Sequence, residues 1–154
     1  MKFVDLIKPE AVKILSSASS KKRLMHEVAD LAASAYDLPC QEVVEALMER
    51  ETLGPTGVGQ GVALPHARLP GLQSVVGAFL VLEKPVDFDS VDRQPVDLVF
   101  ALFAPQDAGV EHLKALALVS RNLREASLCA KLRANLDTGT LHTILTEAEV
   151  VKAA

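Results

Sequence analysis

Residues 95–104, "PVDLVFALFA", form a nearly unbroken apolar run of Val, Leu, Phe and Ala. Two other runs, "VALPHA" at residues 62–67 and "SVVGAFLVLE" at residues 74–83, have a similar composition. Segments rich in β-branched and aromatic residues, set between Pro, Gly and Asp, are typical of strands. Because a strand with one solvated face alternates polar and apolar residues, continuous apolar runs indicate a sheet covered by helices on both faces.

The flanking segments have apolar side chains at helical spacing. Helices are predicted over residues 24–35 and 40–51 before the strand-rich centre, and over residues 109–124, 127–136 and 140–151 after it. A short strand is predicted at residues 11–15, followed by a serine-rich loop in which Ser19 or Ser20 can cap the next helix. The order of strand, two helices, three strands and then helices predicts a single α/β domain over residues 1–154.

Composition narrows the class of protein. The chain has 154 residues, of which 49% are hydrophobic and 23% charged, and this suits one ordinary domain. No apolar run is long enough to span a bilayer, and the first ten residues lack the features of an export signal, so a cytoplasmic protein without membrane insertion is predicted. The formal charge is -4, and residues 21–23 are the basic cluster, interpreted as a solvated first helical turn. Nucleic acid is therefore not expected as a partner.

A glycine-rich segment, "TGVGQGVALPHA", occupies residues 56–67. Gly57, Gly59 and Gly61 place the third glycine one position early for a dinucleotide fingerprint, and the Gly-Lys-Ser/Thr of a P-loop is absent. The segment also precedes a strand, whereas both nucleotide motifs lie between a strand and a helix. No nucleotide cofactor is therefore predicted, and the glycines serve either a turn with positive φ or an anion that needs free backbone N–H groups.

His66 is the chemically suggestive histidine of the four, which are His26, His66, His112 and His142. It follows Pro65 at the end of an apolar run, and strand ends are common functional positions in α/β proteins. A neutral imidazole is a good nucleophile near pH 7 and can accept a phosphoryl group. Arg50 and Arg68 could offset phosphoryl charge, but on spacing alone a helix-terminal cation and a solvated strand-end charge are the more ordinary interpretations of the two. No ligand spacing links the histidines, so no metal site is predicted.

The run from Glu51 to Ala67 resembles the phosphorylation-site signature of the mannitol/fructose-type enzyme IIA domains of the bacterial phosphotransferase system. That signature has an acidic or amide residue, six spacers, an aliphatic-small pair, two spacers, and then aliphatic-Ala-aliphatic-Pro-His-small, and each position is filled here. The segments "SSASSKKRLMHEVADLAA", "EKPVDFDSVDRQPVDLVFALFAP" and "EHLKALALVSRNLR" are similar to the stand-alone nitrogen-regulatory branch.

The resemblance implies a three-layer α/β/α sandwich with a small mixed sheet. It implies that His66 accepts a phosphoryl group through Nε2 from a histidine-containing phosphocarrier protein. It further implies that Arg50 stabilises phosphoryl charge and that His112 either hydrogen-bonds the phosphate or sets the His66 tautomer. The loop of Gly59, Gln60 and Gly61 is expected beside the phosphoryl site. Such a chain is a phosphohistidine carrier without a cofactor, rather than a free-standing turnover enzyme.

By the same resemblance, the phosphorylation state controls binding to regulatory targets such as potassium-transport regulators or sensor kinases. Two alternatives remain open at this point. One is a sugar-specific IIA that passes the phosphoryl group from His66 to a IIB partner, and the other is a binding module that carries no phosphate. Three positions depart from common relatives: Gln60 stands where Asn is frequent, Ala67 where Gly is frequent, and Arg93 where glycine is expected.

Overall fold

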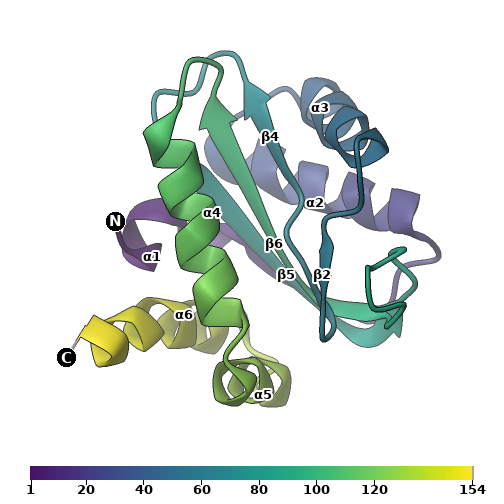
Figure 1. The fold of residues 1–154 in the computed structure, drawn as a ribbon, viewed down its shortest axis with the longest axis vertical. Helices are drawn as coiled ribbons and strands as arrows, with labels where there is room; N and C mark the ends of the chain where they lie inside the picture. The colour runs from purple at the N-terminus through teal and green to yellow at the C-terminus, as the bar shows by residue number, and fades with distance from the viewer. Residues whose placement is uncertain (154) are drawn as a thin grey trace.

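A mixed β-sheet runs through the middle of the molecule (Figure 1). The computed structural model describes residues 1–153, and the side chains of residues 1–147. Within these residues the strands are β1 (Val12–Leu15), β2 (Gly57–Gly59), β3 (Val62–Ala63), β4 (His66–Leu69), β5 (Val76–Val86) and β6 (Val96–Pro105). Their order is β1-β5-β6-β3-β2, and β4 also pairs with β6.

The pairing directions make the sheet mixed, as predicted. β1 lies parallel to β5, and both β3 and β4 lie parallel to β6. The long central pair, β5 and β6, is antiparallel, as is the short pair of β2 and β3. The side chains of β6 are almost entirely buried. This burial is the physical reason that residues 95–104 show no polar alternation.

Helices cover both faces of the sheet, which confirms the three-layer prediction (Figure 1). Figure 1 shows α4 in front of the sheet and α2 behind it. The helices are α1 (Phe3–Leu6), α2 (Lys21–Tyr36), α3 (Cys40–Thr52), α4 (Val110–Leu123), α5 (Ala126–Ala134) and α6 (Thr138–Ala153), with the 3-10 turn η1 (Pro9–Ala11) before β1. No helix among the described residues is long and apolar enough to cross a membrane.

The start of α2 differs from its prediction in one respect. Ser20 caps the helix as expected, because its hydroxyl accepts the Arg23 backbone N–H at 3.1 Å. Lys21, however, is not a simple solvated charge. Its ammonium lies 2.7 Å from the Glu51 carboxylate at the end of α3, and the Lys21 side chain is only 21% exposed. The first turn of α2 is therefore tied to the segment that leads into the glycine-rich region.

His66 lies directly after a break between β3 and β4. Both strands pair with β6, and Leu64 and Pro65 separate them. Pro65 has no N–H, but its carbonyl still accepts the Leu102 N–H at 3.0 Å. The chain thus stays on β6 while the proline interrupts regular strand geometry. His66 is the first residue of β4, directly after this interruption.

Arg93 stands at a backbone position that favours glycine. Its φ is 61°, in the left-handed region, on the connection between β5 and β6. We expect Arg93→Gly to stabilise the protein by about 0.5–1 kcal/mol, because removal of the Cβ strain exceeds the added entropy of the unfolded chain. Urea unfolding measures the change. Arg93→Ala, which removes the side chain but keeps the strain, should give no such gain, and an equal gain in both variants would contradict this explanation.

Candidate functional site

The two ring nitrogens of His66 have partners of opposite character. Nδ1 lies 2.9 Å from the carbonyl oxygen of Leu64, which can only accept a hydrogen bond. The Nε–H of Arg50 donates to Nε2 at 3.2 Å, and a guanidinium can only donate. Together these partners select the neutral tautomer with the proton on Nδ1 and the lone pair on Nε2. Nε2 is therefore the nucleophilic atom of this histidine.

Arg50 is held in place by a second hydrogen bond. Its Nη1 donates to the Gly54 carbonyl oxygen at 3.0 Å, just beyond the end of α3. Arg50 lies in the last turn of α3, where a cation also complements the helix dipole. The helix-end interpretation and the site interpretation are thus compatible, because the terminal position is what brings the guanidinium to His66.

His112 enters the same site from the first turn of α4. Its ring meets the His66 ring edge-on, with centroids 5.6 Å apart and planes at 74°. His112 is 6% exposed, and its Nε2 is a buried atom without a hydrogen-bond partner among the described residues. Buried polar nitrogens normally have partners, so this atom marks a place where a polar ligand group would be satisfied. Since Leu64 already fixes the His66 tautomer, the geometry favours the phosphate-contact role for His112.

Burial lowers the pKa of both histidines. For His66, burial is the main cause, the hydrogen bond to Leu64 opposes it, and the charge of Arg50 lowers the pKa further. For His112, burial again comes first, followed by the neighbouring His66 and then Arg68. A lowered pKa keeps the rings neutral at pH 7, and only a neutral His66 has a free lone pair on Nε2.

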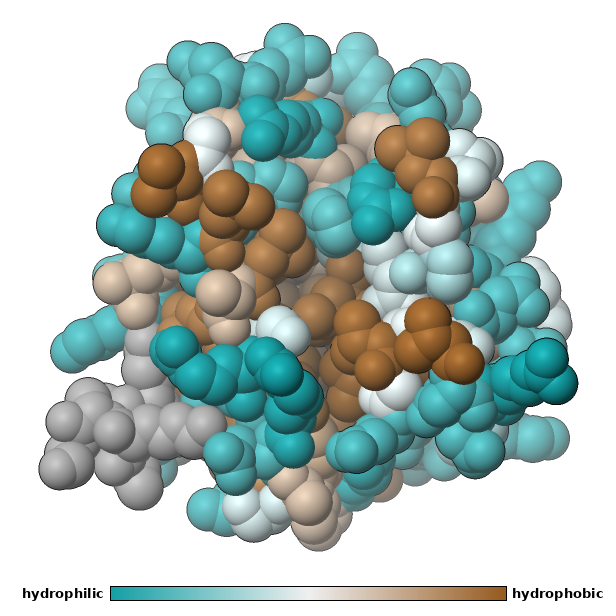
Figure 2. All heavy atoms as spheres, viewed as in Figure 1, coloured by the Kyte–Doolittle hydropathy of each residue, from teal (hydrophilic) through white to brown (hydrophobic). Residues whose placement is uncertain are grey.

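An open pocket of about 510 Å³ surrounds these groups. Its polar part contains Arg50, His66, His112 and Arg68, and the Arg68 guanidinium donates to the Gln106 carbonyl oxygen at 3.2 Å. Its apolar rim includes Leu53, which is 81% exposed, and Leu113, which is 67% exposed. Figure 2 shows hydrophobic surface over both α4 and α3, the helices that contribute this rim. A reactive polar centre within an exposed apolar border is typical of a site that receives another protein.

The predicted place of Gly59, Gln60 and Gly61 beside His66 is not what the structure shows. The Gln60 N–H donates to Asp92 at 2.9 Å, and the Gln60 carbonyl accepts from Arg133 at 2.9 Å. The three residues do not line the His66 pocket; Gly59 and Gln60 line a different one, toward the C-terminal end of α4.

The C-terminal end of α4 is roughly 16 Å along the helix axis from the turn that carries His112, at 1.5 Å per helical residue. The positive φ values of Gly59, Gln60 and Gly61 support the alternative interpretation, a turn that needs left-handed backbone.

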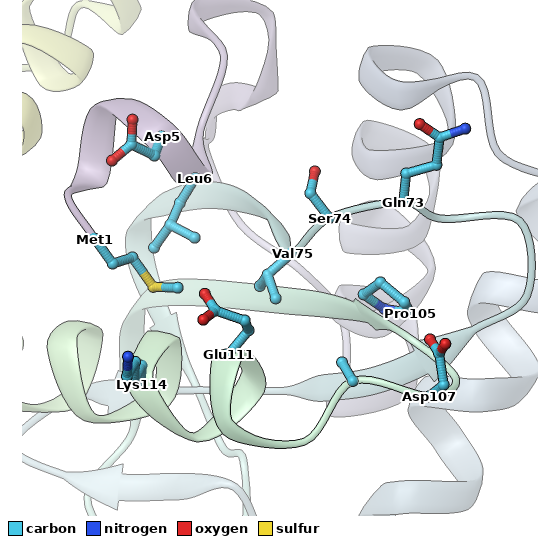
Figure 3. Close-up of a pocket in the computed structure, with 11 residues that line it drawn as sticks. Met1, Asp5, Leu6, Gln73, Ser74, Val75, Pro105, Asp107, Glu111 and Lys114 are labelled. Carbon is cyan, nitrogen blue, oxygen red and sulfur yellow. The ribbon is translucent and has the colours of Figure 1, made fainter.

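A further pocket of about 520 Å³ lies against another face of the first turns of α4 (Figure 3). Glu111 and Lys114 project toward it from α4, while Asp5 and Leu6 come from α1. The charged residues of this pocket are exposed, and neither His66 nor His112 lines it. The first turns of α4 therefore border two pockets, and the candidate chemistry belongs to the one with His66. Among the described residues, no cluster of three or more His, Cys, Asp or Glu could hold a metal ion.

Two contributors to the site escaped sequence reasoning. The Leu64 carbonyl fixes the tautomer, but a backbone oxygen carries no residue-type signal. Glu51 opens the phosphorylation-site signature, but the pattern alone assigns no role to it. In the structure its carboxylate accepts the Thr56 N–H at 2.9 Å and the Thr56 hydroxyl at 2.5 Å. The signature itself was the signal that could have identified Glu51.

Comparison with known proteins agrees with this fold. Residues 5–148 match the family described as "Phosphoenolpyruvate-dependent sugar phosphotransferase system, EIIA 2". The chain is 46% identical over 145 residues to the nitrogen regulatory protein of Bradyrhizobium diazoefficiens, covering 94% of this chain and 95% of that protein.

Solved structures show the same likeness. Nitrogen regulatory protein IIA-Ntr from Neisseria meningitidis superposes with a TM-score of 0.85 at 35% identity, over 92% of this chain and 97% of that one. The mannitol IIA of Escherichia coli superposes with a TM-score of 0.75 at 18% identity, over 90% and 97% of the two chains, a likeness of fold alone. The three-layer fold is thus that of a phosphotransferase IIA domain. The chain belongs to the EIIA type 2 family of the phosphoenolpyruvate-dependent phosphotransferase system, and the resemblance inferred from the signature is confirmed.

Proposed function

We propose that the chain is a phosphoryl-accepting regulatory protein of a nitrogen-related phosphotransferase system. In this proposal His66 receives a phosphoryl group from a histidine-containing phosphocarrier protein, and the phosphorylation state controls binding to regulatory proteins. The observation that supports it best is the tautomer of His66. Its Nε2 carries a lone pair, faces a guanidinium, and belongs to a pocket that is open to another protein.

The transfer needs positioning and charge stabilisation more than acid–base chemistry. The Nε2 lone pair forms a bond to phosphorus as the donor's nitrogen–phosphorus bond breaks, and that electron pair returns to the donor nitrogen. The proton stays on Nδ1, and the Leu64 carbonyl that accepts its hydrogen bond stabilises the positive charge that the ring acquires. Arg50 then turns from Nε2 to the phosphoryl oxygens, where its charge is attractive. His112 Nε2 gains the partner that it lacks in the unphosphorylated site.

Phosphorylation would change the surface that a target protein meets. A phosphoryl group carries close to two negative charges at pH 7, and it would stand among Leu53, Leu113 and Leu116. A partner that docks on the apolar rim would then have to desolvate this charge, whereas a partner with a basic group would gain an ion pair. The same pocket can therefore favour different partners in its two states.

A sugar-specific IIA is the second candidate, because the description of the matched family names sugar transfer. Its first step is identical, so the site geometry does not separate the two functions. The relatives named nitrogen regulatory protein favour the regulatory proposal for this chain.

The testing experiment has two stages. The chain is incubated with labelled phosphoenolpyruvate and the general donor proteins, and we expect one acid-labile phosphoryl group per chain by intact mass and label counting. The labelled chain is then mixed with fructose- or mannitol-specific IIB to measure transfer of the label. In a separate step, the phosphorylated and the unphosphorylated chain are each used to capture binding proteins. Rapid turnover onto IIB would overturn the regulatory proposal in favour of sugar transport. Absence of any acid-labile phosphate would leave a binding module without phosphoryl chemistry.

A further inference from the structure

The carboxylate of Glu51 is buried and fully engaged. The Glu51 side chain is 7% exposed, and one of its oxygens lies 2.7 Å from the ammonium of Lys21. Its two oxygens also accept the N–H and the hydroxyl of Thr56, at 2.9 and 2.5 Å. Lys21 is held in turn over the Phe88 ring, 4.6 Å from its centroid. A buried charge with this many partners is costly to disturb, so the turn between α3 and β2 is firmly anchored on α2.

A first path leads from this anchor to Nδ1 of His66. The carbonyl of Thr56 accepts the Leu64 N–H at 2.9 Å. The carbonyl of the same Leu64 faces Nδ1 of His66 at 2.9 Å. The position of Thr56 therefore sets the position of the carbonyl that selects the histidine tautomer.

A second path leads from the same turn to Nε2. The Gly54 N–H donates to the Glu51 carbonyl at 3.2 Å, which closes the turn after α3. The Gly54 carbonyl in turn accepts from Arg50 Nη1 at 3.0 Å, and Arg50 Nε donates to His66 Nε2 at 3.2 Å. The hydrogen-bond partners of both ring nitrogens are thus positioned by residues 54–56, the segment that the Glu51 carboxylate binds at Thr56.

We propose that Glu51 is a positioning residue for His66, with Lys21 as its counter-ion. Its oxygens bind Lys21 and Thr56 rather than the histidine, so its hydrogen bonds act through the turn. Its only direct effect on His66 is that its negative charge raises the pKa of that ring, and this charge effect does not select between the two neutral tautomers. By fixing residues 54–56, it keeps the proton on Nδ1 and the Nε2 lone pair in the pocket. This inference rests on the proposed function only for its effect on phosphoryl uptake, because the tautomer can be measured without any phosphoryl donor.

The test compares Glu51→Ala with Thr56→Val, and each has a conservative partner. Glu51→Gln keeps an oxygen that can accept from Thr56, and Thr56→Ser keeps the hydroxyl that donates to Glu51. We expect Glu51→Ala and Thr56→Val to lower the rate of phosphoryl uptake by roughly 10-fold or more, as loss of an orienting partner does elsewhere. Thr56→Ser should stay within about twofold of wild type, and Glu51→Gln should lie between.

The deciding measurement is the long-range ¹H–¹⁵N spectrum of the imidazole rings above the His66 pKa. Wild type should show a protonated Nδ1 and an unprotonated Nε2, and Glu51→Ala should show a mixture of the two tautomers. A merely structural role would lower the unfolding temperature and leave the tautomer of the folded protein unchanged, and that result would overturn the proposal. If Glu51→Ala does not fold, the near-isosteric Thr56→Val decides by the same spectrum.

The outcomes separate this inference from the function on which it rests. Wild type that takes up no phosphate, with a tautomer that shifts in Glu51→Ala or Thr56→Val, would refute the phosphoryl acceptor and support the positioning role. Wild type that takes up phosphate, with the same tautomer and rate in the folded variants, would refute the positioning role alone.

Discussion

His66→Gln is expected to lose acid-labile phosphoryl uptake, with a rate at least about 1,000-fold below wild type, because the substitution removes the nucleophile itself. A glutamine amide has similar reach and can still accept from Arg50, but its nitrogen has no available lone pair for attack on phosphorus. His66 is half-buried at the start of β4, so the polar replacement should leave the fold intact. Label transfer from phosphoenolpyruvate through the donor proteins measures the loss.

The matched control is His26→Gln. His26 is also half-buried, but it lies on α2, away from the pocket that contains His66. We expect this variant to take up the phosphoryl group at the wild-type rate, and circular dichroism should show that both variants are folded. Equal labelling of His66→Gln and wild type would refute the assignment of the acceptor.

Much of the fold could be predicted from local sequence patterns. The two long apolar runs became β5 and β6, because both faces of these strands are covered and no residue had to alternate for solvent. The helices also began and ended close to their predicted limits, since capping and apolar spacing are local properties. Ser20 is an example, because its hydroxyl bonds a backbone N–H only three residues away.

The short strand β2 could not be predicted from its own residues. β2 consists of Gly57–Gly59, and glycine has low strand propensity, so this segment looked like a loop. It becomes a strand because β3 pairs with it, with Gly57 opposite Ala63. A side chain at Gly57 would collide with Ser90, which lies on a connection more than thirty residues away. No local pattern could show that this glycine serves a close approach.

The sequence predicted three residues that the candidate site brings together, but not the geometry of that site. The signature and the resemblance identified Arg50, His66 and His112, and the fold brings the three together. The place of Gln60 could not be read from its nearness to His66 in sequence. β3 and β4 run along β6, so the glycine loop at one end points away from the histidine at the other. The loop is held by hydrogen bonds between Gln60 and the side chains of Asp92 and Arg133, two residues far along the chain.

Arg50→Gln is expected to reduce the rate of phosphoryl uptake by about 100-fold or more, because it removes a preorganised cation from the place where phosphoryl charge develops. It should also raise the pKa of His66. Burial, the main cause of the low pKa, would remain, but the repulsion between Arg50 and a protonated ring would be gone. The loss of activity in acid should therefore begin at a higher pH than in wild type. Single-turnover uptake across pH and an NMR titration of His66 measure the two effects.

Arg50→Lys separates charge from geometry. A lysine keeps the positive charge, so the pKa of His66 should stay close to its wild-type position, but it lacks the planar fork that bonds Nε2 and the Gly54 carbonyl together. We expect its rate to recover only partly, to about 10-fold below wild type. Full recovery in Arg50→Lys would show that charge alone matters and that the observed hydrogen bonds do not. A rate for Arg50→Gln within twofold of wild type would remove Arg50 from the proposed site altogether.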